Sequence, residues 1–130
     1  MKKMKRKLTI LIADRNKNVR DFLRREFSSE GYGIITARDG NQVLEEIGRE
    51  NPPDLLILDL EIPDADSSEI LEKAQRRNPP VPVVIHTFLT EESERDTLRD
   101  SEIFIEKSGN VDYLKSAVAD MLQRFHREYA

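Results

Sequence analysis

The chain has 130 residues, a length that suits one domain with a sizeable core. It contains no cysteine, which excludes disulfides and thiolate chemistry, and no apolar run approaches the roughly 20 residues of a membrane-spanning helix. The formal net charge is -4, so the composition argues against a nucleic-acid-binding domain, and a cytoplasmic protein is the simplest interpretation.

The charge is uneven along the chain. Five of the 21 Lys and Arg residues lie in the first seven positions, which leaves 16 basic against 25 acidic residues in the remainder. We expect residues 1–7 to form a solvated basic tail and residues 8–130 to form a single domain. The tail could instead touch nucleic acid or anionic lipid, but it lacks the apolar core of a secretion signal.

Strand-like and helix-like patterns alternate along the rest of the chain. Runs of branched apolar residues predict strands at Leu8–Ala13, Gly33–Ala37, Leu55–Leu58, Val83–His86 and Ile103–Ile105. Between the strands, apolar residues recur at helical spacing, in stripes that begin at Val19, Val43, Ile70 and Val111. Residues 91–100 have almost only Leu98 as an apolar anchor, so a helix there would be loosely held. The alternation predicts helices on both faces of a parallel sheet.

Polar side chains stand where the predicted strands end. They are Asp14, Asp59, Thr87 and Lys107. Asp59 is the most informative, because it follows Leu55–Leu58, a run apolar enough for a strand buried on both faces. Open α/β sheets build their sites at the carboxyl ends of the strands, so two carboxylates, a hydroxyl and an ammonium would meet there.

The residues around these strand ends form motifs that follow one another in a familiar order. The motifs are Ile10-Leu11-Ile12-Ala13-Asp14, Asp54-Leu55-Leu56-Ile57-Leu58-Asp59-Leu60-Glu61-Ile62-Pro63, Val81-Pro82-Val83-Val84-Ile85-His86-Thr87 and Phe104-Ile105-Glu106-Lys107. With these motifs the chain resembles the receiver domain of bacterial two-component response regulators, over residues 7 to 128. The resemblance implies a flavodoxin-like, doubly wound (βα)5 sandwich with a parallel sheet of order 2-1-3-4-5.

The resemblance also implies a role for each site residue. Asp59 would accept a phosphoryl group from a histidine kinase or phosphotransfer protein in a two-component phosphorelay. Thr87 and Lys107 would contact that group, and Phe104 would act as the aromatic switch. Such a domain is a signalling module rather than an enzyme. It catalyses at most its own phosphorylation and dephosphorylation, and it acts on a downstream protein partner.

A magnesium site is implied as well, with Asp14, Asp59 and the backbone carbonyl of Glu61 as ligands. The family normally has a second acid after the first strand, where this chain has Arg15. Arg15 cannot coordinate a cation, so we expect weak Mg²⁺ binding. Arg15 would either reach Asp59 in the metal's place or swing to solvent. The Glu61 carboxylate could hold Arg15 or replace the missing acid, although a solvated loop residue is the favoured interpretation.

Two further departures surround the predicted site. Phe88 stands where the family has a small residue, and its ring would cover the acceptor or pack outward against residues 91–100. Ser108 replaces a proline that often follows a cis bond, so we expect a trans bond before Ser108 or a reshaped loop, with Lys107 less firmly placed. Together with Arg15, these residues favour an alternative function: a degenerate receiver that acts as a phosphorylation-independent protein-interaction module.

Neither histidine is expected to take part in chemistry. His86 precedes Thr87 on a strand, so its side chain should point to the opposite face of the sheet and be packed or hydrogen-bonded. His126 would lie on the polar side of the last helix, and the two histidines are not spaced as a metal pair. The long last helix should cover the sheet, and a homodimer through it stays open.

Overall fold

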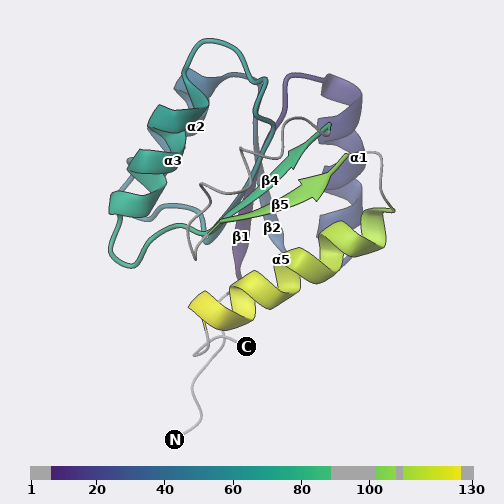
Figure 1. Cartoon of the computed structure of the whole chain (residues 1–130). Coiled ribbons are helices and arrows are strands. Elements are labelled where there is room, and N and C mark those ends of the chain that lie inside the picture. The colour runs from purple at the N-terminus through teal and green to yellow at the C-terminus, as the bar shows by residue number, and fades with distance from the viewer. Residues whose placement is uncertain (1–6, 89–101, 108–109, 127–130) are drawn as a thin grey trace, which may run out of the picture.

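The computed structural model describes residues 7–88, 102–107 and 110–126 (Figure 1). In chain order its elements are β1 (Thr9–Ala13), α1 (Lys17–Ser28), β2 (Gly33–Ala37), α2 (Gly40–Ile47), β3 (Leu55–Leu58), α3 (Ser67–Arg76), β4 (Val83–Thr87), β5 (Glu102–Glu106) and α5 (Val111–Phe125). The predicted basic tail up to residue 6, the weak segment 91–100 and Ser108 lie outside the described residues. Among the helices that are described, none is long and apolar enough to cross a membrane.

The five strands form one parallel sheet in the order β2-β1-β3-β4-β5. This confirms the doubly wound order 2-1-3-4-5. The central strand β3 is buried along its whole length, because it has neighbours on both sides and helices over both faces. Its four apolar residues therefore bring the next residue, Asp59, to the middle of the carboxyl edge of the sheet.

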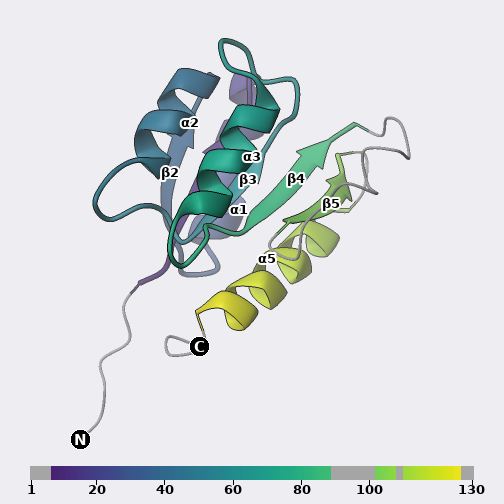
Figure 2. The ribbon, with the colours of Figure 1, turned by 60° about the vertical axis from the view of Figure 1, so that its left-hand side comes forward.

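Two apolar cores lie on opposite faces of the sheet. Helices α2 and α3 cover one face and α1 and α5 cover the other, as the two views show (Figures 1 and 2). The first core joins Val43, Ile47 and Ile70 to the sheet, and the second is built around Phe27 and Val118. Burying a side chain of this size contributes on the order of 1.5–3 kcal/mol, so the two cores fix the sheet that carries the strand-end groups.

Side-chain caps begin each of the four described helices. The caps are Asn16, Asp39, Asp66 and Asn110, and each accepts at least one backbone N–H from the first turn. After α1, Gly31 has a φ of 98°, a left-handed conformation that favours glycine. These local signals keep the loop after β1 short, which places Arg15 close to the strand ends.

The prediction for His126 is wrong. Helix α5 ends at Phe125, and His126 follows with a non-helical φ of -138°. Its position on a helical wheel is therefore irrelevant, and its side chain is buried at the opposite edge of the sheet. There its Nε2 atom lies 3.0 Å from the carbonyl oxygen of Asp54.

Candidate functional site

Asp14 and Asp59 lie side by side because they end adjacent strands. The N–H of Asp59 donates to the carbonyl of Ala13 at 2.9 Å, and the N–H of Asp14 donates to the carbonyl of Ala37 at 3.1 Å. These bonds extend the sheet by one residue beyond each strand. The two carboxylates are 2% and 1% exposed, respectively, so the fold holds two like charges in a nearly dry position. Such an arrangement is stable only with cations or donors nearby.

The two carboxylates differ in how their oxygens are used. In Asp14, Oδ1 accepts the N–H of Asn16 at 2.8 Å and Oδ2 lies 2.8 Å from the ammonium of Lys107. In Asp59, Oδ1 accepts the N–H of Glu61 at 3.0 Å. The Oδ2 atom of Asp59 is buried without a hydrogen-bond partner among the described residues. Of the two acids, only Asp59 therefore has a carboxylate oxygen that accepts no hydrogen bond from the described residues; we call it the uncommitted oxygen.

Two cations face the uncommitted oxygen of Asp59. The ammonium of Lys107 lies 3.5 Å from Oδ2, and the Nε of Arg15 lies 3.7 Å from it. The side chain of Lys107 is 7% exposed. The backbone N–H of Lys107 donates to the carbonyl of Thr87 at 2.9 Å, which fixes the residue beyond the end of β5. Two positive charges therefore face the one oxygen of Asp59 that accepts no hydrogen bond from the described residues.

Arg15 is turned inward rather than swung to solvent. On its outer side it forms an ion pair with the Glu61 carboxylate. The favoured expectation of an unpaired, solvated Glu61 is therefore wrong, because the inward turn of Arg15 brings its guanidinium to that carboxylate. Both side chains are about half exposed, at 49% and 51%, so this pair adds little to stability. It does restrain the guanidinium beside Asp59.

Both carboxylates of the predicted magnesium site face cationic side chains. The Oδ2 atoms of Asp14 and Asp59 are the oxygens that a metal would need, and both face cationic side chains. No cluster of three His, Cys, Asp or Glu side chains suited to a metal occurs within residues 7–88, 102–107 and 110–126. Mg²⁺ demands several oxygens in octahedral geometry, so it would have to displace Lys107 or Arg15 to bind here.

The remaining predicted residues lie where the strand pattern places them. The predicted strand ended at His86, whereas β4 includes Thr87 as its last residue. Thr87 is 2% exposed. Phe104 is partly buried against the core under α2 and α3. Sequence reasoning missed Arg20, whose guanidinium donates to the carbonyl of Asp14 at 2.7 Å. No sequence pattern that we recognise marks that contact.

Phe88 lies beside the site with its ring 56% exposed. The ammonium of Lys107 is 5.5 Å from the centre of the ring, within the range of a cation–π interaction. The ring therefore contacts the cation that faces Asp59. The alternative, in which the ring packs on residues 91–100, involves a segment outside the described residues.

His86 confirms the expectation of a packed histidine, because it is 8% exposed on the face covered by α1 and α5. Burial and, after it, the nearby charge of Lys107 lower its pKa to about 4, against the opposing effect of Asp14 and Asp59. His86 is therefore neutral at pH 7.

This pKa predicts a loss of stability in mild acid. Between the folded value of about 4 and the unfolded value of about 6.5, the unfolded chain binds more protons, so stability falls as the pH falls through that window. We expect about 2 kcal/mol of unfolding free energy to be lost through His86 between pH 7.5 and pH 5. Urea unfolding at both values measures it. His86→Leu should show a smaller pH difference by that amount, and equal losses in the two proteins would contradict the assignment.

The fold and site together define a class: parallel, doubly wound domains with an acidic site at the carboxyl edge of the sheet. A family model, the response regulator receiver domain, matches residues 10–119, and the chain belongs to this family. It is thus a receiver domain of the two-component type, as the sequence motifs predicted.

Relatives agree with this assignment. The response regulator MprA of Mycobacterium leprae is 33% identical over 88 residues, a match that covers 68% of this chain and 38% of MprA. The receiver domain of a putative Luxo repressor protein from Vibrio parahaemolyticus is 26% identical, with a TM-score of 0.84 and 95% of both chains covered. The response regulator TrrA of Thermotoga maritima, solved with Mg²⁺ and BeF, is 30% identical, with a TM-score of 0.73 and coverage of 88% of this chain and 98% of that one.

Proposed function

We propose that the protein accepts a phosphoryl group on Asp59 and so receives a signal from a histidine kinase or a phosphotransfer protein. The observation that carries the proposal is the uncommitted Oδ2 atom of Asp59, buried and faced by two cations. Asp14 is the less suitable acceptor, because both of its oxygens already have partners. The proposal places this step in the cytoplasm and passes the signal to a downstream protein.

The proposed transfer needs only charge compensation and positioning from the protein. A new bond forms between phosphorus and Oδ2 of Asp59 while the bond from phosphorus to the donor's nitrogen or oxygen breaks, and the donor leaves with that electron pair. Lys107 and Arg15 face the oxygen that would carry the phosphoryl group, so they would pair with part of the incoming negative charge. The hydroxyl of Thr87 would donate to one phosphoryl oxygen. A magnesium ion held weakly by Asp14, Asp59 and the backbone carbonyl of Glu61 would supply the remaining positive charge.

We also propose that the magnesium site is weak, because cationic side chains already face its carboxylates. Two carboxylates face two cations, so a dication entering the site meets no net attraction from these four groups. TrrA, whose structure contains Mg²⁺ and BeF, shows that a relative takes the ion. In this chain Arg15 is the residue that we hold responsible for the difference.

The alternative, a phosphorylation-independent interaction module, draws support from the inward Arg15. It is not favoured, because the similarity to response regulators covers most of the chain and the acceptor oxygen remains uncommitted. The two are separated by incubating the protein with acetyl phosphate and measuring its intact mass. A gain of one phosphoryl group supports the proposal, whereas no gain, with or without magnesium, would refute it.

We expect Phe88→Ala to shorten the lifetime of the phosphorylated protein. The ring contacts Lys107, and an exposed cation–π contact contributes about 0.5–1 kcal/mol. Its loss frees the ammonium and opens the acceptor to water, so the phosphoryl group should be lost about two- to fivefold faster.

Decay of labelled phosphate measures this effect. Tyr113→Ala is a matched control, because Tyr113 is also an exposed aromatic residue, on α5. Equal rates of phosphoryl gain and loss in Phe88→Ala and the wild type would show that the ring has no influence on the acceptor.

A further inference from the structure

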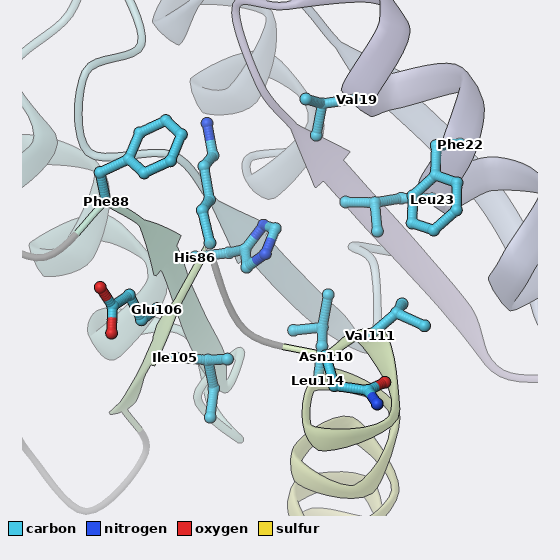
Figure 3. A pocket seen from close by; sticks show the side chains of 11 residues that line it. Val19, Phe22, Leu23, His86, Phe88, Ile105, Glu106, Asn110, Val111 and Leu114 are labelled. Carbon is cyan, nitrogen blue, oxygen red and sulfur yellow. The ribbon is translucent and has the colours of Figure 1, made fainter.

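A cavity lies between α1, the ends of β4 and β5, and the start of α5 (Figure 3). Its volume is about 160 Å³. Its apolar wall is made of Val19, Leu23, Ile105, Val111 and Leu114, and the polar residues Glu106 and Asn110 line it as well. Lys107 also lines it, so one side chain separates this cavity from the oxygen of Asp59. The cavity is distinct from the acceptor site but shares a wall with it.

One polar group in this apolar wall has no obvious reason to be there. His86 is more than nine-tenths buried, and its Nδ1 atom has no hydrogen-bond partner within the described part of the chain. Figure 3 shows the imidazole ring projecting into the cavity, toward Val19 and Leu23. Leaving a buried polar atom unpaired is unfavourable. A ligand that supplied the missing hydrogen bond would remove that penalty.

The residues that border the cavity also indicate a ligand site. Three large apolar side chains are exposed in the part of the chain that the structure describes, and two of them, Phe22 and Phe88, border this cavity. Large apolar side chains gathered at the mouth of a pocket are typical of a ligand site. The apolar wall and these rings favour a flat, uncharged ligand.

Size and hydrogen bonding define the ligand further. A cavity of roughly 150 Å³ with an apolar lining is known to hold a benzene ring. His86 is neutral at pH 7, so its Nδ1 is a donor in one tautomer and an acceptor in the other. A hydroxyl group can pair with either. A charged group would find no free partner in Lys107, whose ammonium is already bonded to Asp14.

We propose that this cavity binds a single-ring aromatic molecule that carries a hydroxyl group, with the ring among the apolar side chains and the hydroxyl on Nδ1 of His86.

The test uses p-cresol as the probe and toluene as its partner without a hydroxyl. Both are titrated into the unphosphorylated protein while the methyl resonances of Val111 and Leu114 are followed by NMR. We expect saturable shifts at these methyls, with p-cresol bound about three- to tenfold more tightly than toluene. His86→Leu should remove that preference while leaving toluene bound. No saturable shift at these methyls, or equal preference in the variant, would overturn the proposal.

Two substitutions on the same helix provide the control. Val111→Phe places a ring in the cavity and should abolish p-cresol binding, whereas Ala119→Phe adds the same ring to an exposed position of α5 and should leave binding unchanged. Val19→Phe fills the cavity from α1 and keeps the test decisive if Val111→Phe does not fold. Undiminished binding in a folded, filled variant would overturn the assignment. Because binding is measured without phosphorylation, failure of the acceptor proposal leaves this result intact.

Discussion

Asp59→Asn should abolish phosphorylation of the protein by acetyl phosphate. The substitution keeps the size and shape of the side chain but removes the charged oxygen that attacks phosphorus. Asp14 should not replace it, because its Oδ1 is held by the N–H of Asn16 and its Oδ2 by Lys107. Intact-mass measurement should therefore show one added phosphoryl group in the wild type and none in the variant.

Asp64→Asn is the matched control for this experiment. Asp64 lies in the loop after β3, is exposed, and has a φ of 72° that Asn also tolerates. The same chemical change there should leave phosphorylation unaffected, which separates loss of the acceptor from disturbance of the loop. A phosphoryl group that persists in Asp59→Asn would refute the acceptor assignment, and peptide mapping would then locate the true acceptor.

Arg15→Asp should strengthen magnesium binding at least tenfold. The substitution changes the local charge by two units and restores an oxygen ligand beside Asp14 and Asp59. At an effective dielectric constant near 20, one charge at about 4 Å is equivalent to roughly 4 kcal/mol. Arg15 is 49% exposed, so solvent screening reduces this strongly. A tenfold change needs only about 1.4 kcal/mol, which leaves the effect measurable.

Calorimetric or NMR titration with magnesium measures this change, and Arg15→Ala divides it into its parts. The alanine variant removes the positive charge without adding a ligand, so its affinity should fall between those of the wild type and Arg15→Asp. If the wild type already binds magnesium as tightly as Arg15→Asp, the guanidinium does not compete with the metal. The proposal that Arg15 weakens the magnesium site would then be refuted.

Local patterns were sufficient for the elements of this fold. The predicted strand at Leu55–Leu58 matches β3 in both bounds, because a short, continuous apolar run between a proline pair and a carboxylate allows few other structures. Local patterns were not sufficient for the order of the strands. Apolar periodicity predicted a parallel sheet, and only the family resemblance selected 2-1-3-4-5, since strand order depends on contacts between distant segments.

The residues of the site could be named from the sequence because each ends a strand, and parallel strands end at one edge. The ion-pair partners of these residues could not be predicted from the sequence. Lys107 bonds Asp14 at 2.8 Å and approaches Asp59 only to 3.5 Å, although both acids were within its predicted reach. Arg15 turned inward and Glu61 followed it, against the favoured expectation for Glu61. Such choices between ion pairs depend on differences of an ångström in three dimensions.

The sequence by itself thus determined the strand ends, which follow from short apolar runs. The resemblance of its motifs to receiver domains supplied the family and the acceptor candidate. The tertiary structure alone decided which carboxylate oxygen stays uncommitted, where the guanidinium of Arg15 lies, and that His86 faces a cavity with an unpaired nitrogen. The physical reason is that hydrogen bonds and ion pairs are short-ranged and directional. Their partners, often many tens of residues apart, are fixed only when the sheet and its helices have packed.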